Sequence, residues 1–174
     1  LARDPQTTEL VVAPGNPGTS VIATNLNIDP SVPEEVVALA TQMEADLVVV
    51  GPEAPLVAGV ADAVRDAGVP CFGPSAEAAR LEGSKAFAKE IMTAAGVPTA
   101  EAAVCTTEAE LTAALDRFGA PYVVKEDGLA AGKGVVVTDE RPVALAHGRA
   151  CLTRGSGRVV VEDYLDGPEA SVFC

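Results

Sequence analysis

Residues 122–134 read Tyr-Val-Val-Lys-Glu-Asp-Gly-Leu-Ala-Ala-Gly-Lys-Gly, and this stretch decides the interpretation of the chain. It starts with an apolar run typical of a β-strand, which carries Lys125, and continues into a loop of small residues that carries Lys133. A second apolar run follows at once, at 135–137. The pattern predicts a strand, a glycine loop and a second strand. Backbone N–H and ammonium groups in such a loop can close over nucleotide phosphates, so the sequence indicates a protein that handles ATP.

The loop has to be distinguished from a Walker A loop, which also binds nucleotide phosphates. A Walker A loop has a glycine, four further residues and then Gly-Lys-Ser/Thr, and it leads into a helix. Here only three residues separate Gly128 from Gly132, and Gly134 stands at the position of the magnesium-binding hydroxyl. Valines follow, and they predict a strand instead of a helix. The loop does not fit a Walker A site, and taken alone it fits a glycine-rich hairpin with a solvated lysine equally well.

The charge of the chain favours the phosphate interpretation. The sequence has 25 acidic and 12 basic residues, a formal net charge of −13 and a pI near 4.3. Such a chain repels nucleic acid, anionic membranes and free phosphate ligands, so a phosphate site needs cations placed for that purpose. All lysines fall within one window of the sequence: Lys85, Lys89, Lys125 and Lys133. Their clustering favours a phosphate site, although a helix at 84–95 can also carry Lys85 and Lys89 for solubility alone.

Length and composition exclude several classes of protein. With 174 residues and 48 % hydrophobic content, the chain can form one large or two small domains with a proper core. It has no tryptophan and six aromatic residues, four Phe and two Tyr, which excludes nucleic-acid binding by base stacking. No signal peptide and no apolar run of membrane-spanning length is present, so a cytoplasmic protein is expected.

The cysteines and the histidine give no indication of a metal site. The four cysteines form no C-x-x-C pair and fall in apolar runs or on a helix face, so they are predicted to be small core residues in a reducing compartment: Cys71, Cys105, Cys151 and Cys174. His147 is the single histidine. It cannot form a His-rich metal site and argues against a Ser-His-Asp triad, so it is expected to be an ordinary polar residue of a helix.

Both ends of the sequence suggest a piece of a longer protein. Leu1 stands where an initiator methionine is absent, and the first residues resemble the tail of a helix. Residues 169–174 are predicted to form a strand that stops in mid-course.

Residues 1–80 alternate between apolar runs and helical patterns. Strands are expected at 9–13, 46–50 and 69–73. The run at 46–50 is almost wholly apolar, as in a strand covered on both faces. A helix is expected after Ser31, because Ser31-Val-Pro-Glu34 has the spacing of a capping box, and another is expected to end at Ala67. The alternation predicts an α/β fold with a doubly wound parallel sheet.

Two loops of this part come directly after predicted strands, at 14–19 and 51–56. Ligands of parallel sheets bind in the loops at the carboxyl ends of strands. Asn16 and Thr19 in the first loop and Glu53 in the second can all contact a ligand. Proline and glycine in both loops are equally typical of turns that serve structure alone, so the residues leave both interpretations open.

The pattern changes after Gly83. A helix is predicted over 84–95, with Ser84 as its N-cap and Lys85 in its first turn. Thr107-Glu-Ala-Glu110 predicts a capping box at the start of a further helix. The remaining expectations are a strand at 101–105, the strand–loop–strand at 121–138, a helix near 142–153 and a strand at 158–161.

Several motifs, taken in order, resemble those of the phosphoribosylamine–glycine ligase family, also called glycinamide ribonucleotide synthetases. These are Ala13-Pro-Gly-Asn-Pro-Gly-Thr19, Val50-Gly-Pro-Glu-Ala-Pro-Leu56, Phe72-Gly-Pro74, Leu81-Glu-Gly-Ser-Lys-Ala-Phe87, Asp127-Gly-Leu-Ala-Ala-Gly-Lys-Gly134 and Glu162-Asp-Tyr-Leu-Asp-Gly167 with Glu169-Ala-Ser171. The resemblance covers the whole chain. Within the ATP-grasp superfamily, the first two motifs indicate this family over biotin carboxylases and D-alanine ligases.

The resemblance implies two domains. Residues 1–83 are expected to form a pre-ATP-grasp substrate domain with a doubly wound parallel sheet, which lacks its first strand and glycine-rich turn. Residues 84–174 are expected to form the N-terminal part of an incomplete ATP-grasp fold, with a flexible lid subdomain near 102–162.

The resemblance also implies the reaction. Members of the family join glycine to 5-phosphoribosylamine in de novo purine biosynthesis, with cleavage of ATP to ADP and phosphate through a glycyl phosphate. The protein supplies positioning and charge neutralisation, with no covalent nucleophile. The expected partners are these small molecules, with no nucleic acid and no membrane, and the protein is expected to be a monomer. Mg²⁺, with Mn²⁺ as an alternative, is expected to find its ligands outside this chain.

Site residues are carried over from the family motifs. The resemblance implies that Lys85, Lys125 and Lys133 act on the ATP phosphates. The loop expected to close over them consists of Gly128, Leu129, Ala130, Ala131, Gly132 and Gly134. The adenine edge is expected to meet the backbone of Glu162, Asp163, Tyr164 and Leu165, and Glu169 to hold the ribose hydroxyls, because a carboxylate accepts two hydrogen bonds from a diol. The phosphoribosylamine pocket is expected to include Asn16, Gly18, Thr19, Glu53, Pro55 and Leu56.

One departure from the family pattern lies inside the loop motif. Glu126 stands where the family usually has a small residue, and a carboxylate beside the phosphates weakens binding unless it points away, which strand alternation from Lys125 allows. A hypothesis of a different class is a nucleotide-binding module without ligase activity, which would bind ATP and not turn it over. A different ATP-grasp ligase is a further alternative if the loops at 14–19 and 51–56 bind another acceptor.

Overall fold

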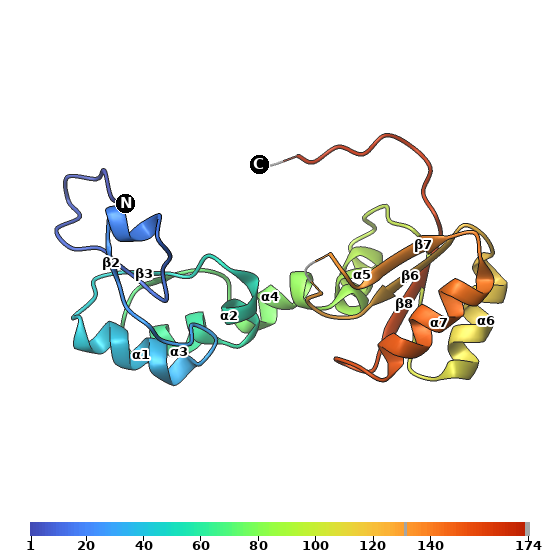
Figure 1. The fold of residues 1–174 in the computed structure, drawn as a ribbon, viewed down its shortest axis with the longest axis horizontal. Helices are drawn as coiled ribbons and strands as arrows, with labels where there is room; N and C mark the ends of the chain where they lie inside the picture. Colours follow the sequence, from blue (N-terminus) through green and yellow to red (C-terminus); the bar gives the residue numbers. More distant parts are fainter. Residues whose placement is uncertain (131, 173–174) are drawn as a thin grey trace. The chain divides into compact units, whose positions relative to one another are not determined.

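A computed structural model describes residues 1–130 and 132–172 of the chain (Figure 1). The chain divides into two compact units, Leu1–Arg80 and Leu81–Cys174. Each unit contains both helices and strands, which confirms the predicted α/β class.

Parallel strand pairs form the sheet structure of the first unit. β1 (Val11–Val12) pairs with β2 (Thr24–Asn25), and β3 (Val48–Val49) pairs with β4 (Cys71–Phe72). The parallel pairing agrees with the prediction, but the strands form two separate two-stranded sheets. Val49 is 46 % exposed, so the expectation that residues 46–50 are covered on both faces is wrong.

Short helices surround these strands. They are η1 (Thr19–Val21), α1 (Pro33–Gln42), α2 (Glu53–Val57), α3 (Val60–Asp66) and α4 (Ala76–Gly83). The single helix expected up to Ala67 is divided into α2 and α3 at Gly59, whose φ of 89° is left-handed. No helix was predicted from the sequence at the position of α4. A small core of Leu56, Ala61 and Ala79 joins α2, α3 and α4.

The start of α1 differs from the prediction. The N-cap is Val32, which makes no side-chain capping bond, and Pro33 is the first helical residue. The Ser31 N–H donates to Asp29 Oδ1 at 2.9 Å, and the Asp29 N–H donates to Glu35 Oε2 at 2.9 Å. The predicted capping box at Ser31 is therefore wrong, because the Ser31 side chain caps no N–H group and Glu35, in the first turn of α1, bonds to the backbone of Asp29 before the helix.

The second unit contains an antiparallel sheet with the strand order β5-β8-β6-β7. Its strands are β5 (Ala102–Cys105), β6 (Tyr122–Glu126), β7 (Val135–Thr138) and β8 (Val159–Glu162). β6 and β7 are the two strands that flank the glycine loop, which confirms the predicted strand–loop–strand. The helices of the unit are α5 (Lys85–Ala94), α6 (Glu108–Phe118) and α7 (Arg141–Leu152).

One face of this sheet packs against α6 and α7, which lie side by side (Figure 1). The core between them consists of Cys105, Leu111, Ala114, Leu115, Val124, Ala144, Cys151, Val159 and Val161. Burial of Cys105 and Cys151 confirms the prediction for these two cysteines. Cys71 is only half-buried, and Cys174 lies outside the described residues.

The opposite face of the sheet carries the charged residues. Side chains of a strand alternate between faces, and residues paired across strands share a face. Val124 faces α6 and α7, so Val123 and Lys125 lie on the opposite face, together with their partners on β8, Glu162 and Val160. We call this face, which holds Lys125 and Glu162, the lysine face.

Local capping signals in the second unit are confirmed. Ser84 Oγ accepts a hydrogen bond from the Phe87 N–H at 3.2 Å and caps α5. Thr107 and Glu110 form the reciprocal capping box of α6.

None of the helices among residues 1–130 and 132–172 is long and apolar enough to cross a membrane.

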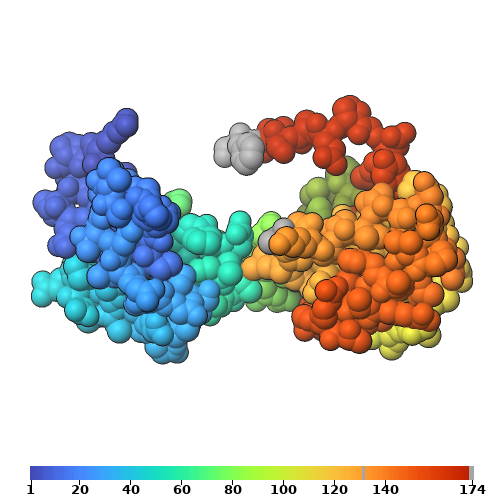
Figure 2. All heavy atoms as spheres, in the orientation of Figure 1, coloured from blue at the N-terminus to red at the C-terminus, as the bar shows by residue number. Residues whose placement is uncertain are grey.

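The segment that follows β8 leaves the body of the second unit (Figures 1 and 2). Residues 163–172 contain no strand, so the strand expected from Glu169 is wrong over its described part. A strand needs a hydrogen-bonded neighbour, and no described strand pairs with this segment. Residues 173–174 of that expectation lie outside the described residues.

The different starts of α6 and α1 give a prediction of stability. Thr107→Ala removes a formed capping bond and should lower the free energy of unfolding by about 1 kcal/mol. Ser31→Ala is the matched control, since its side chain caps no helix, and should stay within about 0.5 kcal/mol of the original. Urea unfolding followed by far-UV circular dichroism measures both, and equal losses would contradict this account of the two helix starts.

Candidate functional site

Three lysines from two elements meet beside the glycine loop. Lys85 is the first residue of α5, Lys89 lies one turn further along the same helix, and Lys125 lies on β6. Burial lowers the pKa of Lys125, and the ammonium groups of Lys89 and Lys85 lower it further. The lysines that cluster in the sequence therefore also influence one another in the structure. The solubility role considered for Lys89 is wrong, because its side chain is only 16 % exposed.

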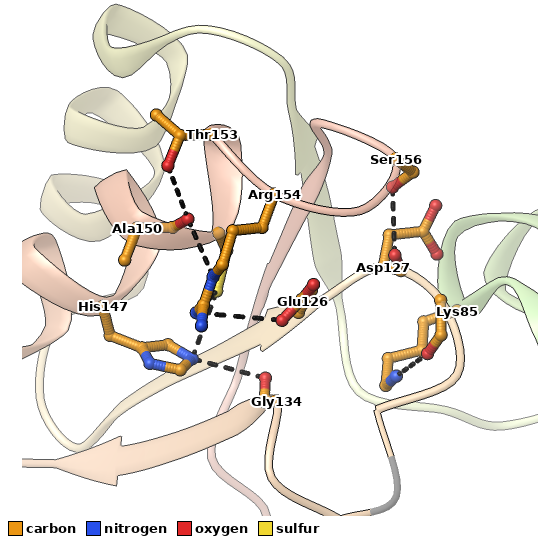
Figure 3. Close-up of polar contacts among 11 residues, drawn as sticks. Lys85, Glu126, Asp127, Gly134, His147, Ala150, Thr153, Arg154 and Ser156 are labelled. Carbon is orange, nitrogen blue, oxygen red and sulfur yellow. Dashed lines mark hydrogen bonds and ion pairs between the residues drawn. The ribbon is translucent and has the colours of Figure 1, made fainter.

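We call the two residues at which the glycine loop joins its strands the stems of the loop: Asp127 after β6 and Gly134 before β7. The first stem, Asp127, is 2 % exposed. Its carboxylate accepts hydrogen bonds from Ser84 Oγ at 3.1 Å and from the Ala86 N–H at 3.2 Å. It also forms an ion pair with Arg158 at 2.8 Å. The backbone of Asp127 is held as well, because its carbonyl accepts from Ser156 Oγ at 2.9 Å (Figure 3). Asp127 thereby fixes the loop to the N-terminus of α5.

The position of Lys85 follows from this contact. A carboxylate at a helix N-terminus is stabilised by the free N–H groups and the helix dipole. Because Asp127 occupies that end of α5, Lys85 stands next to the loop, and its Nζ donates to the Gly128 carbonyl at 2.9 Å (Figure 3). Asp127, Ser84 and Arg158 are parts of the site that were not predicted from the sequence. The sequence contained a signal for this contact, because the N-cap Ser84 directly precedes Lys85 and Asp127 directly precedes the glycine loop.

The second stem is Gly134, whose carbonyl accepts from the Glu126 N–H at 2.7 Å. His147 Nε2 lies 3.3 Å from the same carbonyl (Figure 3). A Cβ at this position would lie 2.6 Å from the Cβ of Ala130, so only glycine lets the loop fold back this closely. His147, expected as an ordinary helix residue, therefore connects α7 to the loop.

Glu126 points away from the lysine face, as strand alternation allows. Its carboxylate lies 3.8 Å from Arg154 Nη2 and faces the turn after α7 (Figure 3). A Cβ at Gly155 would lie 2.9 Å from Glu126 Oε1, which shows how closely this turn approaches the carboxylate. The extra negative charge is thus directed to the face of the sheet that packs on α7, and not to that of Lys125.

Several of the described residues between the stems are exposed. The Lys133 N–H donates to the Ala130 carbonyl at 2.8 Å, and Leu129 is 45 % exposed. Gly132 has a left-handed φ of 75°. The exposed Lys133 side chain forms no ion pair with any residue in the described part of the chain. Ala131, expected to belong to the same loop, lies outside the described residues.

Glu162 is the last residue of β8 and is 5 % exposed, so it is a buried carboxylate. Its carboxylate pairs with Lys125 and, at 2.7 Å, with Lys89. The Asp163 N–H donates to the Glu101 carbonyl at 3.0 Å. Tyr164, Leu165 and Glu169 are exposed on the segment that leaves the unit. The adenine and ribose roles of these residues remain predictions.

The loop at 14–19 in the first unit is held by its own side chains. Asn16 Oδ1 accepts from the N–H groups of Gly18 at 2.8 Å and Thr19 at 3.1 Å. Thr19 Oγ1 lies 2.9 Å from both Asn16 O and Asn25 Oδ1, either of which can accept its single hydrogen. A Cβ at Gly15 would lie 2.3 Å from Asn25 Cγ, which explains the glycine there. The contacts of Asn25 with this loop were not predicted from the sequence.

The second predicted substrate loop becomes the start of α2. Glu53 is its exposed first residue, whereas Pro55 and Leu56 are buried. Leu56 belongs to the core of the first unit, which gives it a structural role in addition to any contact with a ligand. The roles of these six first-unit residues remain predictions.

The described residues near the lysines form no metal site, and a cavity lies beside Lys89. No group of three His, Cys, Asp or Glu side chains within residues 1–130 and 132–172 is placed to hold a metal ion. A cavity of about 830 Å³ lies beside α5 and β5 and has Lys89, Glu90 and Val104 in its wall. Its lining includes neither Lys125 nor any residue of the loop, but it includes Ala102 and Val104, which pair with Glu162 and Val160 of β8. The cavity therefore lies at the β5 end of the lysine face, away from the loop.

Removal of the Asp127 charge tests the first stem. Asn has nearly the shape of Asp, but Asp127→Asn loses the ion pair with Arg158. The amide NH₂ group would also replace one carboxylate oxygen as the neighbour of the Ser84 hydroxyl or the Ala86 N–H, which are themselves donors. The substitution should destabilise the protein by about 2–3 kcal/mol and raise the hydrogen-exchange rate of the amides at 84–88. Glu126→Gln is the control, because its exposed partner lies at 3.8 Å, and should cost less than about 1 kcal/mol. Unchanged exchange at 84–88 in the Asp127 variant would contradict the role of this residue.

Comparisons with known proteins agree on both parts of the chain. Residues 1–82 match the family model described as phosphoribosylglycinamide synthetase, N domain, and residues 83–174 match phosphoribosylglycinamide synthetase, ATP-grasp (A) domain. The chain is 63 % identical over 173 residues to phosphoribosylamine–glycine ligase of Streptomyces coelicolor, covering 99 % of this chain and 40 % of that protein. The Mycobacterium tuberculosis protein of the same name is 59 % identical over 179 residues, with 100 % and 42 % covered.

Solved structures show the same fold. The crystal structure of phosphoribosylamine–glycine ligase from Thermotoga maritima has a TM-score of 0.71 and 31 % identity, covering 94 % of this chain and 39 % of that one. The biotin carboxylase domain of Hydrogenobacter thermophilus 2-oxoglutarate carboxylase, solved with MgADP, has a TM-score of 0.74 at 21 % identity, with 91 % and 39 % covered. At that identity the second likeness concerns the fold alone. The chain spans about two fifths of the length of the curated relatives it matches.

Proposed function

Because the chain belongs to the phosphoribosylglycinamide synthetase family, we propose that the protein carrying it joins glycine to 5-phosphoribosylamine at the expense of ATP. We further propose the domain limits 1–83 for the substrate domain and 84–174 for the first part of the ATP-grasp domain, with a lid near 102–162. The product is glycinamide ribonucleotide, released with ADP and phosphate.

The observation that carries the nucleotide part of this proposal is the arrangement around the glycine loop. Lys85 and Lys125 lie on different elements at the first stem of the loop, and Lys133 lies within it. In a chain of net charge −13 this is a local concentration of cations. Ammonium groups and backbone N–H groups at such a loop suit a triphosphate, whose negative charge they neutralise.

The register of the sheet supports a direction for the nucleotide along the strands, with the base further from the glycine loop than the phosphates. Glu162, Val123 and Val137 form one row across β8, β6 and β7, and Lys125 lies in the next row on the same face, toward the loop. Two residues along a strand span about 6.6 Å. We therefore place the base on the valine row, beside the backbone of 162–165, and the phosphates at Lys125 and the loop. Val137 is 54 % exposed and can cover an apolar ring.

The proposed reaction needs no covalent bond to the protein. A carboxylate oxygen of glycine attacks the γ-phosphorus of ATP, the bond to the β-phosphate oxygen breaks, and ADP leaves with that electron pair. The amine of phosphoribosylamine then attacks the glycyl carbonyl carbon, phosphate leaves, and the amine loses a proton. Lys85, Lys125 and Lys133 neutralise charge that moves between the phosphates, and closure of the loop excludes water. A divalent cation, Mg²⁺ or alternatively Mn²⁺, would accompany ATP, but the described residues provide no site for it.

The first unit is proposed to bind phosphoribosylamine, because it matches the N domain of the family. Asn16 and Thr19 are already hydrogen-bonded to their own loop. Their proposed part is therefore to hold the loop in a fixed shape, whose backbone near Gly18 meets the ligand. Glu53 is exposed at the start of α2 and is the charged member of the proposed pocket, with Pro55 and Leu56 behind it.

ADP release tests the ligase. The intact-length protein should form ADP only when glycine and freshly generated phosphoribosylamine are supplied together. Lys125→Met should lower the rate about 10²-fold, the loss typical for one group that stabilises transition-state charge. Arg149→Met is the control, since that exposed arginine pairs with Glu108 on the surface, and it should keep full activity. ATP binding without turnover under every combination would leave a nucleotide-binding module and reject the ligase.

The lowered pKa of Lys125 gives a pH dependence. Only the protonated ammonium attracts phosphates, and in the free protein burial makes this group lose its proton below the ordinary lysine pKa of 10.5. ATP affinity should therefore be constant at neutral pH and fall as pH rises through the lowered value. Titrations of ATP between about pH 7 and 10 measure the fall. Lys125→Met should abolish it, and an equally steep fall in that variant would assign the effect to another group.

A further inference from the structure

The carboxylate of Glu162 lies between two ammonium groups. Lys125 Nζ pairs with Oε1, and Lys89 Nζ pairs with Oε2 at 2.7 Å. The Glu162 side chain is 6 % exposed, against 16 % for Lys89 and 28 % for Lys125. Both pairs are therefore shielded from water, where an ionised carboxylate without a partner is strongly unfavourable.

The two lysines differ in how firmly they are held. An ammonium group has three N–H donors. Lys89 uses all three, on Glu162, on Thr99 Oγ1 at 2.8 Å and on the Ala100 carbonyl at 2.8 Å. Lys125 Nζ, by contrast, has Glu162 as its one polar partner among the described residues. Lys89 is consequently fixed in place, whereas Lys125 keeps two donors for another ligand.

We propose that Lys89 is a positioning residue for Lys125: by holding Glu162, it frees Lys125 to bind the phosphates of the nucleotide. The inference rests on the proposed nucleotide site and adds to it a residue that does not touch the ligand. When Lys125 turns to a phosphate, Glu162 keeps the Lys89 ammonium as a buried counter-ion. Without Lys89, Glu162 would have Lys125 alone, and every phosphate contact of Lys125 would leave a buried carboxylate unpaired.

A simple structural role for Lys89 makes a different prediction. Through Thr99 and Ala100, Lys89 also braces α5 against the segment before β5. If bracing were its sole role, loss of Lys89 would weaken the whole nucleotide site, base and phosphates alike. If it acts through Glu162 and Lys125, the loss is confined to ligands with phosphates.

The test compares ATP with adenosine. In the intact-length protein, competition against a fluorescent ATP analogue gives the affinity of each. Lys89→Met should weaken ATP about tenfold, as expected for one charge-assisted hydrogen bond, and leave adenosine within about twofold. Arg149→Met, which removes a remote surface cation, should change neither. Equal weakening of ATP and adenosine by Lys89→Met, or no weakening of ATP, would overturn the proposal.

A second variant separates the mechanism from misfolding. Glu162→Gln in the Lys89→Met background removes the carboxylate that would retain Lys125, while the backbone at 162 stays. ATP affinity should then recover by at least about threefold from the single variant, which corresponds to half of the loss on a logarithmic scale. A further loss in the double variant would overturn the proposal. The readout is affinity, so a protein that binds ATP without forming ADP would reject the ligase and still decide the role of Lys89.

Discussion

The site depends on one buried interaction, the contact of Asp127 with the N-terminus of α5. Asp127 is the last residue before the glycine loop, and its carboxylate is satisfied by Ser84, by the Ala86 N–H and by Arg158. Because α5 begins at this carboxylate, Lys85 is placed beside the loop and Lys89 one turn away, over the lysine face. A shift of this helix end would move both lysines together.

The lysines of the chain are few and concentrated, because three of the four lie together beside the glycine loop. Here burial and the mutual proximity of Lys85, Lys89 and Lys125 make it costly to keep all three charged, as the lowered pKa of Lys125 shows. A single buried carboxylate, Glu162, compensates two of them. In the proposed nucleotide site, Glu162 would thus balance part of the lysine charge before the phosphates bind.

Sequence reasoning succeeded where a signal acts over a few residues and failed where it acts across the fold. The caps at Ser84 and Thr107 follow from neighbouring residues, and alternation along β6 accounts for the opposite directions of Lys125 and Glu126. The contact of Ser84 with Asp127 joins residues 43 positions apart, so no local pattern reveals it. The strand expected at Glu169 failed for the same reason, since a strand depends on a partner that the local sequence does not specify.

The two stems of the glycine loop are held by different kinds of contact. Asp127 is fixed to α5 by buried, charge-assisted bonds, whereas Gly134 is tied to β6 by one backbone bond and approached by His147 from α7. Between them, Lys133 has no ion-pair partner among the described residues. Lys85 and Lys125, by contrast, each hold a partner, the Gly128 carbonyl and the Glu162 carboxylate. In the proposed nucleotide site, these two cations would be in place before the triphosphate binds, and Lys133 would complete the neutralisation of its charge.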